Sequence, residues 1–295
     1  MAAPLLLVDW GTSNRRAWLI DEAGRRIGAL ADDRGLAAVA PDGWEAAYRE
    51  LLDRFGGVRP RLAVLAGMVG SNRGWAEAAY VDCPADLGVL ARHPQWIVPG
   101  EIAIVPGLCQ RAPADVMRGE EVQALGAVEA GLVPGDALAC HPGTHSKWVR
   151  LEAGRIAGFR TQITGELHGL LRRHSLLAEF LDAAVDVDEA FRAGIEQGFA
   201  GDGLTAALFG VRARILLGQS RRSEAPGHVS GLLIGAELRD GLARADGKET
   251  IHVIGRDDLA RLYVAALAHL GREAAIVDGE EAALAGLMAL AERLA

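Results

Sequence analysis

The chain has 295 residues, enough for one large domain or two of ordinary size, and half of them are hydrophobic. Its net charge of −8 argues against a nucleic-acid-binding surface or a surface for anionic membranes. The three cysteines lack the spacing of a metal site, so we expect free thiols in a reducing cytoplasm. We expect no membrane span and no signal peptide, because the apolar runs are short and no basic segment precedes the first one.

Residues 5–20 predict a β-hairpin with a polar turn. Residues 5–8 are apolar and indicate a buried strand that ends at Asp9, and residues 17–20 begin a second strand. A carboxylate directly after a buried strand is costly unless a cation pairs with it. The turn between the strands offers backbone amides and short polar groups, a combination that suits a nucleotide phosphate and its Mg²⁺. The alternative is a hairpin whose polar turn binds nothing.

A compact α/β unit follows the hairpin. Residues 25–30 predict a third strand, residues 43–55 a helix and residues 61–66 a buried strand. That strand leads into a loop, residues 67–75, with three glycines and several polar side chains. Ligands commonly bind beyond the carboxyl ends of such strands, which places this loop near the same cleft as Asp9. The alternative is an ordinary strand-to-helix loop.

Prolines and glycines dominate the next segment. Five prolines between residues 84 and 113 predict irregular structure with one short strand, residues 102–105. Gly119 then precedes a helical pattern that has Glu120 and Glu121 in its first turn. The helix dipole alone would favour acidic side chains there, and the functional alternative is that one of them is a general base.

The second half of the chain repeats the first hairpin. Residues 137–140 predict a buried strand that leads into Gly143-Thr144, which matches Gly11-Thr12. Residues 152–155 then match residues 22–25 as Glu-Ala-Gly-Arg. Two matched turns in the same order predict an internal duplication of a structural unit.

The remainder predicts mostly helices. The helical patterns cover residues 165–177, 188–199, 204–217, 229–242 and 280–294, with a charged loop at 219–226. Strands are expected at 250–255 and 274–277, and Asp257 is expected to cap a helix that runs to residue 270.

Five ordered motifs resemble the 2-dehydro-3-deoxygalactonokinase family, within the superfamily of sugar kinases, heat-shock ATPases and actin. They are Asp-Trp-Gly-Thr-Ser-Asn-Arg-Arg-Ala at 9–17, Ala-Gly-Met-Val-Gly-Ser-Asn-Arg-Gly-Trp at 66–75, Met-Arg-Gly-Glu-Glu at 117–121, His-Pro-Gly-Thr-His-Ser-Lys-Trp at 141–148 and Gly-Leu-Leu-Ile-Gly-Ala-Glu-Leu at 231–238. The resemblance implies an α/β fold of two ribonuclease H-like (actin-like ATPase) domains from an internal duplication, with an ATP cleft between them. We expect the domains to be 1–116 and 117–295, with the last helix returning to the first domain.

The resemblance also implies ATP-dependent phosphorylation of the 6-hydroxyl of 2-dehydro-3-deoxy-D-galactonate in galactonate breakdown, with Mg²⁺. Asp9 would then orient Mg²⁺ through water, and Arg16 would steady the transferring phosphoryl group. The phosphate contacts implied are Gly11, Thr12 and Ser13 from the first turn and Gly143, Thr144 and His145 from the second.

Glu120 stands where related kinases carry the carboxylate that takes the proton of the acceptor hydroxyl, and Glu121 is its rival. For the carboxylate of the sugar acid, Arg73 is the first candidate partner and Lys147 the second, although both suit a solvated surface equally well. The other expected acceptor contacts are Ser71, Asn72 and Trp75. Gly255, Leu259 and Tyr263 would line the adenine site, but Leu259 and Tyr263 also have the spacing of a helix core pair.

Three rival functions remain open on the sequence. One is a kinase of another sugar or sugar acid, because loops rather than the fold set the acceptor. The second is a non-catalytic ATP-binding module of the actin type. The third is an exopolyphosphatase-like hydrolase.

Overall fold

The computed structural model describes residues 3–295, which divide into two compact units. The first unit comprises the chain up to Asp136, Arg150–Phe159 and Gly279–Ala295. The second unit comprises Ala137–Val149 and Arg160–Asp278. The units therefore divide the chain at a different place from the expected 116/117 boundary, and the last helix belongs with the first unit.

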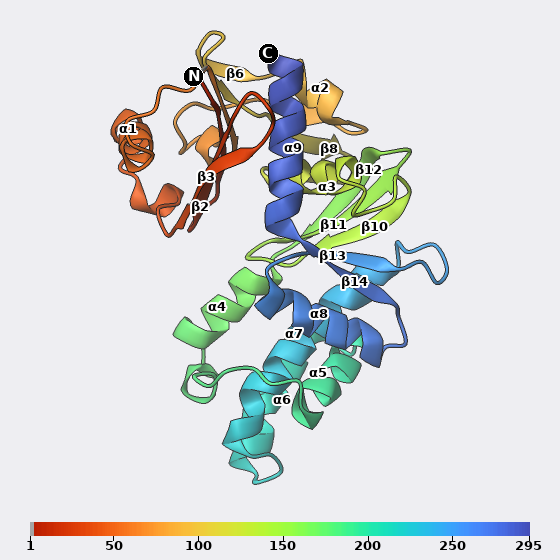
Figure 1. Cartoon of the computed structure of the whole chain (residues 1–295). Helices are drawn as coiled ribbons and strands as arrows, with labels where there is room; N and C mark the ends of the chain where they lie inside the picture. The colour runs from red at the N-terminus through yellow and green to blue at the C-terminus, as the bar shows by residue number, and fades with distance from the viewer. Residues whose placement is uncertain (1–2) are drawn as a thin grey trace. The chain divides into compact units, whose positions relative to one another are not determined.

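A six-stranded sheet in the order β3-β2-β1-β4-β7-β6 organises the first unit (Figure 1). Strand β1 pairs antiparallel with β2 and parallel with β4, so the predicted hairpin of residues 5–20 is confirmed. The strands are β1 (Leu5–Trp10), β2 (Arg15–Ile20), β3 (Arg26–Asp32), β4 (Leu62–Gly67), β6 (Gln95–Val98) and β7 (Ile102–Ile104).

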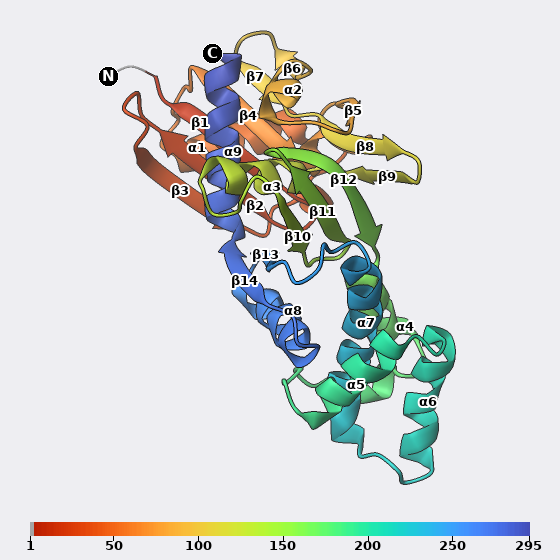
Figure 2. The ribbon, with the colours of Figure 1, turned by 90° about the vertical axis from the view of Figure 1, so that its right-hand side faces the viewer.

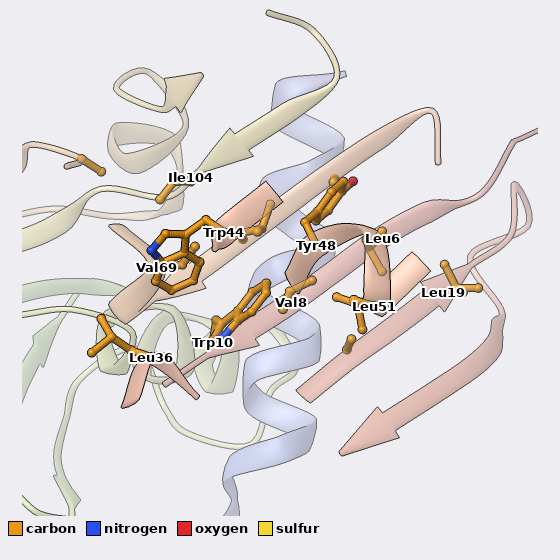
Figure 3. Packing of buried hydrophobic residues seen from close by; sticks show 14 residues of the cluster. Leu6, Val8, Trp10, Leu19, Leu36, Trp44, Tyr48, Leu51, Val69 and Ile104 are labelled. Atoms are coloured by element: carbon orange, nitrogen blue, oxygen red, sulfur yellow. The ribbon is translucent and has the colours of Figure 1, made fainter. Parts of the chain in front are cut away.

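Helices cover both faces of this sheet, which explains why residues 5–8 are apolar without alternation. Helix α1 (Trp44–Arg54) lies on one side of the strands and α9 (Gly279–Leu294) on the other (Figure 1). On the α1 side, the rings of Trp10 and Trp44 meet edge to face with centroids 5.2 Å apart (Figure 3). Helix α9 contacts β1 and β4 as well as α2 (Leu87–Ala91) and α3 (Glu120–Glu129).

The proline-rich segment is more regular than its sequence predicts. Strands β5 (Tyr80–Asp82), β8 (Gly107–Arg111) and β9 (Ala114–Met117) form a separate three-stranded sheet (Figure 2). The expectation of one short strand between residues 80 and 113 is therefore wrong. Every proline of the segment stands between elements, where the missing N–H breaks no sheet hydrogen bond.

The second half of the chain forms a five-stranded sheet in the order β12-β11-β10-β13-β14. The run β12-β11-β10-β13 repeats the run β3-β2-β1-β4 of the other sheet, as the predicted duplication requires, and β14 takes the place that β7 has there. The strands are β10 (Ala137–His141), β11 (Ser146–Glu152), β12 (Arg155–Gln162), β13 (Ile251–Gly255) and β14 (Ala274–Asp278).

The predicted helices of the second unit are present, with two corrections to their starts. Helix α7 begins at Ala225 rather than near residue 229, because Pro226 is tolerated in a first turn. Arg256, not Asp257, is the N-cap of α8, and no side chain caps it. The helices are α4 (Thr164–His174), α5 (Glu189–Ala200), α6 (Leu204–Leu216), α7 (Ala225–Leu242) and α8 (Asp257–His269), and short 3₁₀ turns occupy Leu36–Ala38, Met68–Gly70, Ala178–Phe180 and Arg222–Glu224.

Glycines allow α5 and α7 to pack backbone against backbone. A Cβ on Gly231 would lie 2.1 Å from the carbonyl oxygen of Phe191, and one on Gly235 would lie 2.3 Å from that of Ile195. From the other helix, a Cβ on Gly194 would lie 2.2 Å from the carbonyl oxygen of His228. The glycines of the 231–238 motif therefore serve helix packing.

Replacing Gly231 by Ala should destabilise the protein by about 3 kcal/mol, because neither backbone can yield to the new methyl group. Gly210→Ala is the matched control, since a Cβ there would meet its nearest neighbour at 3.6 Å and helix propensity would improve. Thermal unfolding of both variants measures the difference. Equal melting temperatures would contradict the close packing of α5 on α7.

Candidate functional site

The turn between β1 and β2 uses its carbonyl groups for backbone hydrogen bonds and leaves two of its amides without a backbone acceptor. Its carbonyl groups at Gly11, Thr12 and Ser13 accept hydrogen bonds from the amides of residues 36, 37 and 35, at 2.9, 3.0 and 3.2 Å. Within residues 3–295, the amides of Thr12 and Ser13 donate to no backbone carbonyl, and both residues are exposed. Successive amides without a backbone acceptor are a combination that can bind an anion.

Gly35 holds this turn in place, a role that the sequence did not reveal. A Cβ on Gly35 would lie 2.5 Å from the carbonyl oxygen of Thr12 and 2.6 Å from the amide nitrogen of Ser13. The contact joins residues more than 20 positions apart, so no local pattern could have identified it.

Asp9 lies among charged groups at the end of β1. Arg16 faces it across the hairpin, with Nη1 3.9 Å from Oδ2, and Gln123 on α3 donates to the same oxygen at 3.5 Å. Burial raises the pKa of Asp9 to about 6; the charge of Arg16 opposes this shift and that of Glu120 adds to it. The first unit therefore brings together the predicted residues Asp9, Arg16 and Glu120.

Glu120 and Glu121 have different environments at the start of α3. Both carboxylate oxygens of Glu121 accept the N–H of Gly119, at 2.8 and 2.7 Å, and its side chain is completely buried. Burial, with the charge of Glu120, raises the pKa of Glu121 to about 7. Glu120 is half-buried and accepts the backbone N–H of Arg118 at 3.2 Å. The geometry therefore favours Glu120 for contact with a substrate.

Two glycines let α3 approach the end of β1. Gly67 and Gly119 both have positive φ, +92° and +105°. A Cβ on Gly119 would lie 3.2 Å from Cα of Gly67, and one on Gly67 would lie 2.7 Å from the carbonyl oxygen of Trp10. Larger residues at either position would move Glu120 away from Asp9.

The second predicted phosphate turn follows β10 in the other unit, and the start of α4 supports it. The carbonyl of Thr144 accepts the N–H of Glu166 at 2.9 Å, and His145 Nε2 lies 2.7 Å from Glu166 Oε2. A Cβ on Gly165 would lie 2.2 Å from the carbonyl oxygen of Gly143. Gly165 is thus a further supporting residue that the sequence did not identify.

A small, mainly apolar cavity of about 130 Å³ adjoins Gly143. Leu259 and Tyr263 line it, and both also pack in the hydrophobic core as the helix pair that their spacing allows, whereas Gly255 stands at the end of β13 outside the lining. His168 also lines the cavity, and burial lowers its pKa so that the imidazole is neutral near pH 7. The mainly apolar lining of this cavity suits a flat, largely apolar group that has a few polar atoms at its edge.

A buried carboxylate fixes Tyr263 and β11. Glu237 accepts the hydroxyl of Tyr263 at 2.8 Å and the indole N–H of Trp148 at 3.0 Å. Burial raises its pKa, although these hydrogen bonds act against the shift. The sequence feature that could have indicated this role is that Glu237 is the single acidic residue of the otherwise apolar 231–238 motif.

The predicted acceptor loop holds both buried and exposed residues. Ser71 is buried and its Oγ accepts the N–H of Arg73 at 3.3 Å, whereas Asn72 and Arg73 are exposed. Trp75 packs on the ring of Tyr48 with centroids 5.2 Å apart. Lys147 belongs to the other unit, where it is buried and donates to the carbonyl of His145 at 3.3 Å.

Three further features concern metals, membranes and thiols. In the described part of the chain, no group of three or more His, Cys, Asp or Glu side chains is arranged to hold a metal ion.

None of the helices between residues 3 and 295 combines the length and apolar character needed to cross a bilayer. All three cysteines are free thiols, as predicted, with Cys109 and Cys140 buried and Cys83 half-buried.

Replacing Glu121 by Gln should stabilise the unliganded protein by about 2 kcal/mol more at pH 8 than at pH 5. The pKa of Glu121 is about 7 in the native state against an ordinary 4.5, so its stabilising contribution is complete below pH 4.5 and is lost as the pH rises through 7. Gln keeps an acceptor for Gly119 and does not ionise. Glu129→Gln, an exposed position of the same helix, is the control. Urea unfolding at several pH values measures the difference, and a gain independent of pH would refute it.

Comparisons with known proteins agree with these observations. A family model described as 2-keto-3-deoxy-galactonokinase matches residues 9–290. A probable 2-dehydro-3-deoxygalactonokinase of Rhizobium meliloti is 37% identical over 97% of this chain and 96% of its own length. The 2-dehydro-3-deoxygalactonokinase of Escherichia coli is 36% identical over the full length of both chains.

Solved structures show the same fold. A crystal structure of a candidate 2-dehydro-3-deoxygalactonokinase from Sinorhizobium meliloti superimposes with a TM-score of 0.91, at 36% identity over 98% of both chains. Component A of (R)-2-hydroxyglutaryl-CoA dehydratase from Acidaminococcus fermentans shares only the fold, with a TM-score of 0.55 at 12% identity and full coverage of both chains. The predicted α/β fold of two ribonuclease H-like domains is confirmed. With a family model that spans nearly all of its length and relatives more than one-third identical, the chain belongs to the 2-keto-3-deoxy-galactonokinase family.

Proposed function

We propose that this chain is an ATP-dependent kinase that phosphorylates the 6-hydroxyl of 2-dehydro-3-deoxy-D-galactonate, in the breakdown of galactonate. The observation that carries the proposal is the cluster of Asp9, Arg16 and Glu120 beside a turn that has two amides without a backbone acceptor, in a chain of this family. Phosphoryl transfer needs mainly alignment and stabilisation of charge, and these groups supply both. The same proposal includes a cytoplasmic location. It also limits the partners to small molecules, with neither nucleic acid nor membrane among them.

The proposal assigns phosphate contacts to both glycine turns. Gly11, Thr12 and Ser13 contact phosphate oxygens in the first turn, and Gly143-Thr144-His145 is the second phosphate-binding turn. The cavity beside Gly143 accepts the adenine ring against Leu259, and Gly255 lies next to Pro142 at the edge of this region. Nucleotide binding is supported by a structure of the same fold, a Clostridium difficile dehydratase activator with bound ADPNP, with a TM-score of 0.53.

The surroundings of Asp9 suit a magnesium ion held through water. Glu120 is close enough to Asp9 for its charge to raise the pKa of Asp9. Two carboxylates this close together attract a cation. Hard carboxylate oxygens and retained water molecules are the usual surroundings of Mg²⁺. When bound, Mg²⁺ would supply positive charge to the phosphate oxygens, and Asp9 would orient it.

Glu120 acts as the general base in the transfer step. The acceptor hydroxyl gives its proton to the Glu120 carboxylate while its oxygen bonds to the γ-phosphorus, and the bond from that phosphorus to the bridging oxygen of ADP breaks. Arg16 lies on the neighbouring strand and neutralises charge on the transferred group. Ser71, Asn72, Arg73 and Trp75 form the acceptor side of this proposal, with Lys147 as a further cation.

The first test measures ADP release from ATP and Mg²⁺ with and without 2-dehydro-3-deoxy-D-galactonate, with its gluconate epimer as the comparison. We expect release that depends on the galactonate compound and yields a 6-phosphorylated product. ATP binding without acceptor-dependent turnover would reject this acceptor, and a wider screen would then separate another sugar kinase from a non-catalytic ATP-binding module. ADP release at the same rate with and without every acceptor tested would indicate a hydrolase.

Glu120→Gln should lower kcat by about 100- to 10,000-fold while the affinity for ADP stays within about threefold, because the amide cannot take a proton. Glu129→Gln on the same helix, exposed and paired with Arg293, is the matched control and should leave kcat unchanged. Steady-state kinetics and calorimetry give the two readouts. If Glu121→Gln loses turnover and Glu120→Gln does not, the roles of the two residues are reversed.

A further inference from the structure

Arg118 is a buried cation with unsatisfied hydrogen-bond donors. The residue stands between β9 and α3 in the chain and is only 8% exposed. Nη2 donates to the carbonyl of Ala78 at 2.7 Å, and the guanidinium carbon lies 4.5 Å from the centre of the Tyr80 ring. Nε and Nη1 are buried and have no hydrogen-bond partner. A guanidinium has five N–H donors, so most of its capacity is unused.

No carboxylate of the described chain neutralises Arg118 by direct contact. Among the ion pairs of residues 3–295, none includes Arg118. Glu121 is near enough for the charge of Arg118 to lower its pKa, but both oxygens of Glu121 are bound to the Gly119 amide. Burial keeps the pKa of Glu121 near 7, so much of this carboxyl is protonated at neutral pH. A buried charge without a full partner is costly, and an anionic ligand would relieve the cost.

The position of Arg118 connects the acceptor loop to the general base. Nη1 lies 2.8 Å from the point where a Cβ of Gly70 would be, directly before Ser71. The backbone N–H of Arg118 binds the carboxylate of Glu120 at 3.2 Å. The guanidinium therefore lies against Gly70, the residue before the loop of residues 71–75, and the backbone of Arg118 holds Glu120.

We propose that Arg118 binds the carboxylate of the sugar-acid acceptor and thereby sets the preference for an acid over a neutral sugar. This inference rests on the proposed kinase function and names the residue that recognises the acceptor's charge. The planar guanidinium suits a carboxylate, and a hydrogen bond from a charged donor is stronger than a neutral one. Nε and Nη1 are covered by their neighbours, so binding through them requires these neighbours to move when the acceptor enters.

The two cations expected from the sequence are less suited to this role. Arg73 is exposed, so water competes for its charge. Lys147 is buried beside the second phosphate turn, where it donates to the carbonyl of His145, and this place suits a phosphate contact. Of the three, Arg118 is the buried arginine, with its guanidinium against Gly70 and its backbone N–H bound to Glu120.

The test compares kcat/KM for 2-dehydro-3-deoxy-D-galactonate with that for its methyl ester, which has the same carbon chain without the charge. In Arg118→Met we expect the ratio of acid to ester to fall about 10- to 100-fold, with the ester value nearly unchanged. Arg118→Lys should keep part of the preference, because it keeps the charge. Arg111→Met, a surface arginine of the same unit paired with Asp82, is the control and should keep the wild-type ratio.

A structural role would give a different result, since it would lower kcat/KM for acid and ester equally in both Arg118 variants. That outcome would overturn the inference, as would loss of the preference in Arg73→Met or Lys147→Met with Arg118→Met unaffected. Failure of the proposed function is separately visible, because wild-type protein would then phosphorylate neither compound. Melting temperatures of all variants identify any that fail to fold, and Arg118→Lys then carries the comparison.

Discussion

The structure of the first unit depends on a carboxylate at the end of a strand that is buried on both faces. Asp9 follows an apolar run that α1 and α9 enclose, and its side chain is only 17% exposed. Arg16 lies 3.9 Å away, and the Glu120 charge raises the pKa of Asp9 further, to about 6. A carboxylate pair in such surroundings is costly without a cation. The fold of the first unit thus favours the binding of a cation beside Asp9 and Glu120, where the proposed phosphoryl transfer needs positive charge.

Glycines determine how closely the groups of this cluster approach. Gly67 and Gly119 let the start of α3 reach the end of β1, and Gly35 lets a neighbouring loop lie against the turn of residues 11–14. In each case a single methyl group would meet backbone atoms at 2.5 to 3.2 Å. Backbone atoms cannot rotate away as a side chain can, so these distances are rigid constraints on the site.

The second unit uses a similar combination of close packing and buried charge. Gly165 seats the start of α4 against Gly143, and Glu237 binds Tyr263 and Trp148 from inside the core. Unlike Asp9, Glu237 is satisfied by hydrogen bonds from neutral donors. Its arrangement is therefore suited to holding the cavity wall and β11 in place, whereas the Asp9 cluster is suited to receiving a ligand.

Much of this protein follows from its sequence. Local patterns predicted the hairpin at Asp9, the strand before the 67–75 loop and the long helices, because turn chemistry and apolar spacing act over a few residues. The repeat of Gly11-Thr12 at Gly143-Thr144 predicted an internal duplication, which the sheets show as the runs β3-β2-β1-β4 and β12-β11-β10-β13. The ordered motifs predicted the family. The tertiary structure alone decided what depends on distant contacts. The strands of the proline-rich segment form only because they pair with one another, and Gly35 matters only because the turn of residues 11–14 folds against it. Glu120 and Glu121 are adjacent residues of the same type, and the sequence alone does not separate their roles. In the structure the backbone N–H of Gly119 binds the carboxylate of Glu121 and not that of Glu120. Arg118 is an ordinary arginine in the chain, and only burial beside Gly70, 48 positions earlier in the sequence, leaves its charge without a full partner.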